Sequence, residues 1–250
     1  MFKGFASVIL GAGEGTRMKS TLPKVLHTVG GKPLVDHVLD TVLSLGMDQQ
    51  ILVLGFRGKT VAGHIQDNPG YGQVTIVFQA KRLGSGHAVL QSAKVLAGYR
   101  GNVLVLCADV PLITKGTLQK LMTLHQRQGN AATILTTVMT TPTGYGRIIR
   151  AGDQVVRIAE EKDASEQEKQ VQEINTGIYC FQAPELFRIL RKIKPNNQKK
   201  EYYLTDAIGL LQQEGACIGA LVCTSNQEVA GINDQHQLAA ANAYYTSRKL

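Results

Sequence analysis

The sequence predicts an α/β fold with a mainly parallel central sheet, and three observations indicate it. Apolar, strand-like runs alternate with amphipathic helical patterns in the first half, a glycine-rich turn follows the first run, and strand-like runs dominate the second half. Strands that alternate with helices form βαβ units, whose right-handed crossovers place neighbouring strands parallel. A Rossmann-like sheet with helices on its faces is therefore expected.

In the first half, the predicted strands are 5–10, 50–54, 74–79 and 102–107. The predicted helices between them are 34–45 and 85–97, each with its apolar residues spaced to form one face. In the second half, the predicted strands are 131–139, 147–150, 155–160, 177–181 and 218–223, with turns at 142–144 and 152–153. The charged stretch 160–173 reads as a surface excursion between two of these strands.

Composition excludes several classes of protein. The 250 residues are 44% hydrophobic, enough for one large domain or two small ones. No secretory signal is visible, and no apolar run approaches the roughly 18 residues of a membrane span. The four cysteines are scattered without metal-ligand spacing, which favours buried thiols and a cytoplasmic location.

The net charge of +8 could indicate either a nucleic-acid partner or a protein that handles polyanionic small molecules. The densest basic run, at 188–200, lies on and after an amphipathic helical pattern and has no interleaved aromatic residues for base stacking. We therefore expect a solvated helix face there, with no nucleic-acid partner and no membrane partner.

The glycine-rich turn has the chemistry of a phosphate-binding loop. Gly11, Gly13 and Gly15 follow the first strand-like run, so backbone N–H groups can approach an anion without interference from a Cβ. Arg17 and Lys24 add positive charge close by. A glycine-rich turn without a ligand is the competing interpretation, which these two cations make less favourable.

Spacing excludes the two commonest phosphate loops. A Walker A loop requires Gly-Lys-Ser or Gly-Lys-Thr at a set distance after its first glycine, and this segment has neither. A dinucleotide fingerprint would place its third glycine at Thr16, and the acidic residue expected after the second strand is missing.

Three motifs from distant parts of the sequence are predicted to meet. The glycine-rich turn follows the first strand, Gln79 ends the third and Asp109 follows the fourth. Ligands of open parallel sheets bind beyond the carboxyl ends of the strands. A single site at that edge is therefore expected.

At this point the sequence resembles the sugar-phosphate nucleotidyltransferases. The opening signature at 11–18 (GAGEGTRM) and 22–24 (LPK) is followed in order by Gln79 with 83–88 (LGSGHA), 109–112 (DVPL), 142–147 (PTGYGR), Glu160 with 162–164 (KDA), 173–177 (EINTG), 201–206 (EYYLTD) and 231–233 (GIN). The resemblance extends over roughly 6–241. More specifically, it is to the uridylyltransferase part of the bifunctional bacterial enzymes that make UDP-N-acetylglucosamine.

The resemblance implies a three-layer, glycosyltransferase-A-like fold with a mixed, mainly parallel sheet. It also implies transfer of UMP from UTP to N-acetylglucosamine-1-phosphate, with Mg²⁺ as cofactor and a place in peptidoglycan precursor synthesis. The phosphate nucleophile is already ionised, so catalysis requires positioning and charge stabilisation without a general base. A single domain over 1–250 is expected, with a nucleotide-binding half at 1–130, a sugar-binding half at 131–232 and a C-terminal helix at 233–250.

The resemblance assigns roles to individual positions. Arg17 and Lys24 match the charge-neutralising pair, and Asp109 and Asn233 match the magnesium ligands. The uridine and its phosphates are assigned to Leu10, Gly11, Ala12, Gly13, Gln79, Gly84 and Ser85, and the amino sugar to Gly146, Glu160 and Asn175. Lys24, Cys107, Ala108, Asp109 and Asn233 complete the expected substrate-binding set. Gln79 could pair with the imide edge of uracil through one donor and one acceptor.

Plainer interpretations compete at several of these positions. Arg17 and Lys24 could be surface cations, Asp109 and Asn233 could be helix N-caps, Gly146 a turn residue and Glu160 a solvated charge. His87, at a helix start, is expected to be structural because the chemistry has no use for it.

Some features depart from the family pattern or leave alternatives open. Gly11 stands where Ala is usual, a small change that should be tolerated. Arg82 and Ala108 replace the usual Gln and Gly, which puts the fit of the base and ribose in question, and Lys200 replaces a Gly and could alter the loop beside it. The 250 residues contain no hexapeptide repeats, so these residues hold no acetyltransferase domain and no trimer contacts, and a monomer or weak dimer is expected. A stand-alone enzyme and a domain of a longer chain both fit this observation. The alternatives are a nucleotidyltransferase for another sugar-1-phosphate or nucleotide, a non-catalytic sugar-nucleotide sensor, and a nucleic-acid-binding protein.

Overall fold

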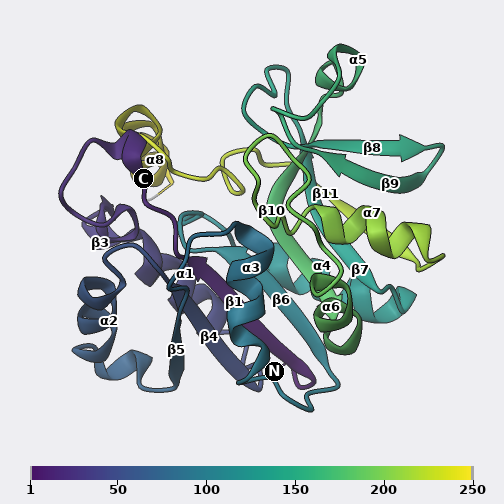
Figure 1. The fold of residues 1–250 in the computed structure, drawn as a ribbon. Coiled ribbons are helices and arrows are strands. Elements are labelled where there is room, and N and C mark those ends of the chain that lie inside the picture. Colours follow the sequence, from purple (N-terminus) through teal and green to yellow (C-terminus); the bar gives the residue numbers. More distant parts are fainter. Residues whose placement is uncertain (1, 249–250) are drawn as a thin grey trace.

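The computed structural model describes residues 2–248 and confirms the predicted α/β fold. Its central sheet has the strand order β11–β7–β10–β6–β1–β4–β5 (Figure 1). The bounds are β1 (Phe5–Gly11), β4 (Gln49–Leu54), β5 (Val74–Phe78), β6 (Asn102–Cys107), β7 (Ala132–Val138), β10 (Glu173–Gln182) and β11 (Ile218–Cys223). β10 runs antiparallel to both of its neighbours, β6 and β7, whereas the other neighbours on this path pair in parallel.

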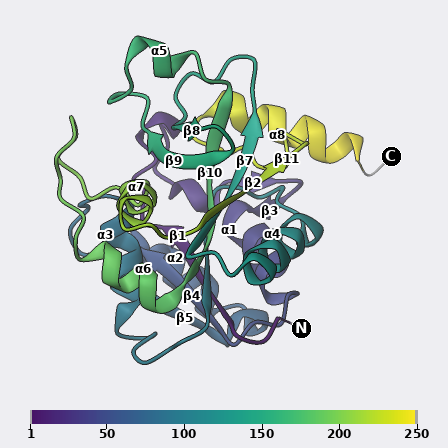
Figure 2. The same cartoon turned by 90° about the vertical axis from the view of Figure 1, so that its right-hand side faces the viewer.

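Helices cover both faces of the sheet (Figure 2). One core cluster packs α1 (Leu34–Leu43), α2 (Gly58–Gln66) and α4 (Lys115–Gln128) on one face. A second cluster packs α3 (Ser85–Leu90), α6 (Ala183–Leu190) and α7 (Asp206–Gln213) on the other. Alternating residues of β1 divide between the two clusters, because successive strand side chains point to opposite faces.

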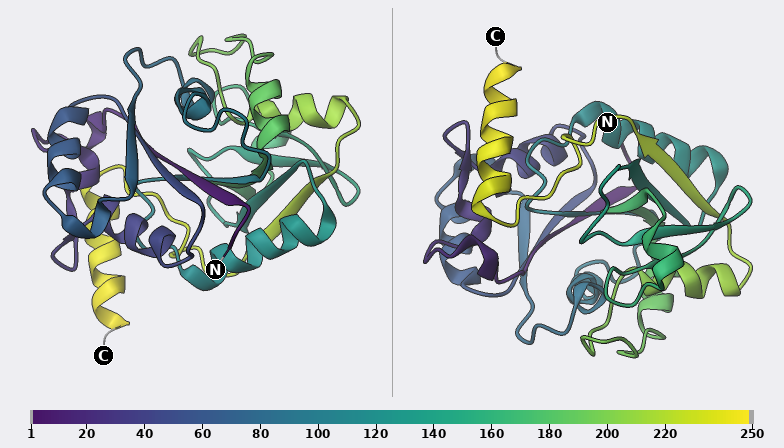
Figure 3. Two further views of the ribbon diagram at one scale, coloured as in Figure 1. Left: turned by 90° about the horizontal axis from the view of Figure 1, so that it is seen from below. Right: turned by 90° about the horizontal axis from the view of Figure 1, so that it is seen from above.

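Smaller elements flank the carboxyl ends of the parallel strands. β8 (Arg147–Ala151) and β9 (Gln154–Ala159) form a ribbon that joins β10, and α5 (Glu166–Lys169) lies in the excursion that follows. The short ribbon β2 (Thr28–Val29) and β3 (Lys32–Pro33) packs against α8 (Gln235–Ser247). Figure 3 shows α8 beside the N-terminal part of the chain, against which Leu238 and Tyr244 pack.

Two predicted elements differ from the observed ones. The helix predicted at 85–97 ends at Leu90 and continues only as a 3-10 turn, η4 (Gln91–Ala93). The strand predicted at 177–181 starts already at Glu173, because a register shift between Asn175 and Ile178 accommodates Gly177 at a φ of 78°. The C-terminal helix predicted at 233–250 is observed as α8, and positions 249–250 lie outside the described residues.

None of the helices in the described part of the chain has the length and apolar character needed to cross a membrane.

Candidate active site

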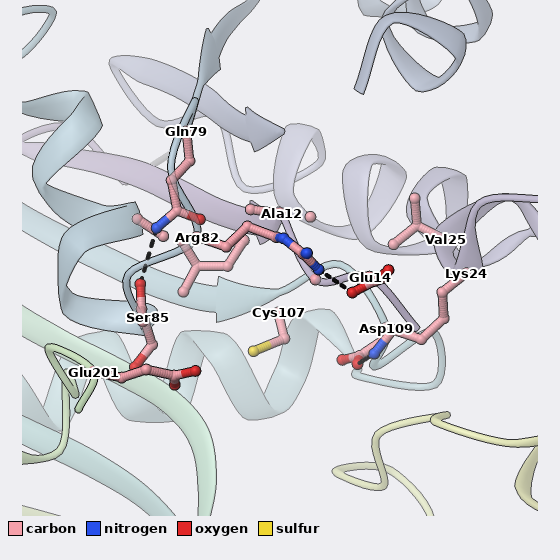
Figure 4. Close-up of a pocket in the computed structure, with 15 residues that line it drawn as sticks. Ala12, Glu14, Lys24, Val25, Gln79, Arg82, Ser85, Cys107, Asp109 and Glu201 are labelled. Atoms are coloured by element: carbon pink, nitrogen blue, oxygen red, sulfur yellow. Dashed lines mark hydrogen bonds and ion pairs between the residues drawn. The ribbon is translucent and has the colours of Figure 1, made fainter. Parts of the chain in front are cut away.

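A cavity of about 360 Å³ opens at the carboxyl ends of the parallel strands (Figure 4). The predicted site residues that line it are Leu10, Gly11, Ala12, Gly13, Lys24, Gln79, Gly84, Ser85, Cys107 and Asp109. The glycine-rich turn follows β1, Gln79 follows β5 and Asp109 follows β6, as the sequence argument requires. The predicted convergence of these three motifs is therefore observed.

Lys24, Asp109 and Asn233 meet at one end of this cavity. The Lys24 ammonium forms an ion pair with the Asp109 carboxylate and lies 3.1 Å from Oδ1 of Asn233. Asn233 is brought there because the backbone N–H of Ile232 donates to the Asp109 carbonyl at 2.9 Å. The Lys24 side chain is only 12% exposed, so it is not the surface cation of the competing interpretation.

The helix-cap interpretations of Asp109 and Asn233 are wrong. Thr114 caps α4 by accepting from the N–H of Thr117, and Asp234 caps α8 by accepting from the N–H of Gln237. The side-chain oxygens of Asp109 and Asn233 therefore cap neither helix. Both are hard oxygen donors, they converge on the position of one cation, and Mg²⁺ prefers such ligands.

A metal held here would need further oxygen ligands. Within residues 2–248, no group of three or more His, Cys, Asp or Glu side chains is arranged to hold an ion. Two protein oxygens suit a Mg²⁺ ion that keeps waters and binds substrate phosphates.

The glycine-rich turn holds Lys24 close to the first strand. Gly15 has a φ of 66°, and an added Cβ would lie 2.6 Å from the Cβ of Lys24. Glycine is therefore required at this position. The chain then forms two 3-10 turns, η1 (Thr16–Met18) and η2 (Lys24–Leu26), which carry Arg17 and Lys24.

Arg17 does not line the cavity and is exposed. Burial and the Asp109 carboxylate raise the pKa of Tyr145, whereas the Arg17 guanidinium lowers it. Arg17 therefore shares an electrostatic environment with Asp109, although the two make no direct contact.

The segment after Glu201 fixes the loop that follows β5. The N–H of Tyr202 donates to the Leu83 carbonyl at 2.7 Å, and the N–H of Gly86 donates to the Tyr202 carbonyl at 2.8 Å. The Ser85 hydroxyl accepts from the N–H of Leu204 at 2.9 Å, so this side chain has a structural partner already. Two chain segments, around residues 83–86 and 201–204, thus build this end of the cavity together.

The predicted sugar-binding residues form a second group next to the cavity. The Gly146 carbonyl accepts from the N–H of Asn175 at 2.8 Å. An added Cβ at Gly177 would lie 3.5 Å from Sγ of Cys107, which places the start of β10 against the cavity wall. Glu160 accepts from the Thr205 hydroxyl at 2.9 Å, and burial raises its pKa. Glu160 is therefore not the freely solvated charge of the competing interpretation.

Two predicted positions are constrained by burial. Ala108 is fully buried and does not line the cavity, and its N–H donates to the Leu10 carbonyl at 2.9 Å. Burial and then the charge of Asp109 raise the pKa of Cys107 to about 12. A neutral thiol there is not a nucleophile near neutral pH.

The cavity also contains residues that the sequence analysis did not assign to the site, namely Glu14, Val25, Arg82, Ala88 and Glu201. Arg82 forms an ion pair with Glu14 at the cavity, drawn as a dashed line in Figure 4. Glu14 lies within the glycine-rich turn and Glu201 within the motif at 201–206. Their positions in these motifs could have indicated from the sequence that they belong to the site.

The fold and this cavity together define a class, the nucleotide-binding α/β proteins with a phosphate-type glycine loop and an adjoining oxygen-donor pair. The chain belongs to the Nucleotidyl transferase family, whose profile matches residues 6–225. It is therefore a member of a family of enzymes.

Curated relatives agree with this family, and a solved structure shares the fold. The chain is 46% identical to the bifunctional protein GlmU of Pelotomaculum thermopropionicum over 246 residues, which cover 98% of this chain and 53% of that protein. It is 47% identical to GlmU of a Geobacillus species over 249 residues, which cover 99% of this chain and 53% of that protein. The chain thus spans about half the length of these relatives. A UDP-glucose pyrophosphorylase in complex with UDP-glucose has the same fold, with a TM-score of 0.75, 19% identity, and coverage of 97% of this chain and 99% of that one.

Proposed function

We propose that this chain transfers UMP from UTP to N-acetylglucosamine-1-phosphate, giving UDP-N-acetylglucosamine and pyrophosphate, with Mg²⁺ as cofactor. The observation that carries the proposal is the meeting of Lys24, Asp109 and Asn233 beside the glycine-rich turn. A lysine that contacts a pair of oxygen donors next to a phosphate-type loop suits a metal-bound triphosphate. The identity to GlmU proteins supports the choice of substrates.

In this proposal an oxygen of the sugar phosphate attacks the α-phosphorus of UTP in line, and the bond to the departing pyrophosphate breaks. Bound Mg²⁺, held by Asp109 and Asn233, would supply positive charge against the phosphate oxygens. The backbone of 11–15 would position the triphosphate, and Lys24 and Arg17 would offset the charge of the leaving group. No side chain needs to act as a base, because the nucleophile is already ionised.

The two substrates would occupy the two groups of residues described above. UTP would lie in the cavity lined by residues 10–13, 79, 84–85, 107 and 109, with its base towards Gln79. The amino sugar would lie against Gly146, Glu160 and Asn175, on the side where Gly177 borders Cys107. The nucleotide-binding half at 1–130 and the sugar-binding half at 131–232 are part of this proposal, as are a monomeric or weakly dimeric state and a cytoplasmic location.

Pyrophosphate release tests the proposal. The assay compares N-acetylglucosamine-1-phosphate with glucose-1-phosphate, each against UTP, dTTP, CTP, ATP and GTP in the presence of Mg²⁺. We expect the highest kcat/KM for N-acetylglucosamine-1-phosphate with UTP. A preference for glucose-1-phosphate or dTTP would change the assigned substrates. No turnover with any pair, in protein that unfolds cooperatively, would indicate a sugar-nucleotide sensor.

A further inference from the structure

The side-chain amide of Gln79 has one possible orientation. Gln79 is 5% exposed, and its Nε2 lies 3.0 Å from the Gly84 carbonyl oxygen and 2.9 Å from Nδ1 of His87. A carbonyl oxygen can only accept, so the NH₂ group must face Gly84, because the rotated amide would bring two oxygens together. Figure 4 shows the result: the nitrogen of Gln79 points along the dashed bond, and its oxygen points into the cavity.

Both hydrogens of this amide are therefore committed to the protein. One goes to Gly84 and the other to His87, so only Oε1 remains for a ligand. The sequence-based expectation of one donor and one acceptor for uracil is thus corrected, since the donor is already in use.

The contact with Gln79 also defines the state of His87. Its Nδ1 accepts a hydrogen from the Gln79 amide, so this nitrogen carries no proton of its own and the imidazole is neutral. Burial lowers the pKa of His87, in agreement with a neutral ring. The amide nitrogen of Gln91 donates to the backbone carbonyl of His87 at 2.9 Å and also lies 3.3 Å from Nε2 of the ring. The Tyr202 ring lies 6.4 Å away between centroids.

We propose that His87 is a positioning residue for base selection, which holds the Gln79 amide so that this side chain offers the base an acceptor and no donor. This inference rests on the proposed function, because it concerns the nucleotide of that same cavity. An acceptor suits bases with an N–H on the ring, such as the imide of uracil or thymine. It rejects cytosine, whose ring nitrogen at that position is itself an acceptor.

The test uses two variants of His87. In His87→Leu the second partner of the Gln79 NH₂ group is lost, and the amide can rotate more freely. In His87→Asn an amide oxygen can take the place of Nδ1, since both atoms lie at the δ position of the side chain. We measure equilibrium Kd values for UTP and CTP, kcat/KM for both nucleotides, and the thermal unfolding midpoint of each protein.

We expect His87→Leu to reduce the preference for UTP over CTP by roughly 10-fold, about the effect of one buried hydrogen bond: the UTP-to-CTP ratio of kcat/KM should fall and the UTP-to-CTP ratio of Kd should rise. His87→Asn should keep each ratio within about 3-fold of wild type, a smaller loss than that of one hydrogen bond. A merely structural histidine would change the unfolding midpoint or the affinity for both nucleotides together, without changing the ratio. An unchanged ratio in His87→Leu, or an equal loss in both variants, would overturn the inference.

The wild-type protein separates this inference from the proposed function. Preference for dTTP would refute UTP as the substrate and leave the inference in place, because thymine has the same ring N–H. Preference for CTP in the wild type would overturn the inference, whatever the sugar phosphate.

Discussion

The ammonium of Lys24 lies 3.1 Å from Oδ1 of Asn233, although 209 positions separate the two residues in the chain. The same ammonium is paired with Asp109, so it occupies the point on which both oxygen donors converge. A divalent cation bound by these oxygens must take that point over from the lysine. Metal binding would then release Lys24 towards the phosphates.

Replacing Lys24 with methionine should therefore have opposite effects on metal affinity and on turnover. The variant keeps the unbranched side chain as far as Cε and removes the charged Nζ. We expect nucleotide-free Lys24→Met to bind Mn²⁺ roughly 10-fold more tightly, a change of about 1.4 kcal/mol, and to have a much lower kcat. Mn²⁺ titration followed by electron paramagnetic resonance measures this affinity. Weaker Mn²⁺ binding in the variant would contradict the idea that a metal ion takes the position of the Lys24 ammonium.

Asp109 and Asn233 should behave as one unit. Asp109→Asn keeps the shape of the side chain and removes its charge, so most activity should be lost with little change in the thermal unfolding midpoint. Asn233→Ala should raise the Mg²⁺ concentration needed for half-maximal rate. The double variant should lose little more activity than Asp109→Asn alone. Loss of the Asp109 carboxylate already disrupts the metal site, so removing the second ligand has little further effect. Additive effects with an unaltered Mg²⁺ dependence would rule out a shared metal.

The Arg17→Ala variant tests whether a cation outside the cavity wall stabilises the charge of the leaving group. We expect Arg17→Ala to lower kcat by roughly 10²- to 10³-fold, the scale for one preorganised charge-stabilising donor, and to affect UTP binding less. Steady-state kinetics checks this, with Arg127→Ala on the exposed face of α4 as a control for the loss of one positive charge. If Arg17→Ala kept more than about half of the wild-type kcat, Arg17 would be an ordinary surface residue.

Gly84 tests whether the loop after β5 needs its backbone geometry. It has a φ of 106°, and an added Cβ would lie 2.6 Å from the Tyr202 carbonyl oxygen. Gly84→Ala should lower the unfolding free energy by about 1–3 kcal/mol and weaken UTP binding. Gly98→Ala is the matched control, because Gly98 also has a positive φ, of 75°, but nothing lies within 4 Å of the added Cβ. Equal losses of unfolding free energy in the two variants would mean that the contact between the added Cβ and Tyr202 does not destabilise the protein.

Asp206 gives the protein a pH dependence of stability. Burial, then the charges of Glu160 and Asp163, raise the pKa of Asp206 from its ordinary 3.8 to about 6. The folded state therefore holds this proton more tightly than the unfolded state, and stability falls as the pH rises from about 4 to about 6. Asp206→Asn should unfold at a higher temperature than wild type at pH 8 and at nearly the same temperature at pH 4. Thermal melts at both pH values check this, with exposed Asp153→Asn expected to show no such difference.

Sequence periodicity predicted the sheet and the edge where the site lies, because apolar strands and glycine turns are local signals. It did not predict that Thr114 and Asp234 would cap the helices, which decides between cap and ligand for Asp109 and Asn233. Nor did it predict the ion pair between Glu14 and Arg82, or the use of both Gln79 hydrogens. These features depend on contacts between residues that are distant in the chain or on the orientation of one side chain, and neither leaves a repeating pattern.

The position of β10 has a consequence for how the chain reaches its fold. This strand, at 173–182, lies between β6 and β7, so the edge of β6 stays unpaired until about seventy further residues have been made. A nascent chain that ends near residue 130 would expose that edge to other strands. The loop of 83–86 likewise lacks its partners until 202–204 arrive. Synthesis must therefore pass residue 204 before the nucleotide cavity can be complete.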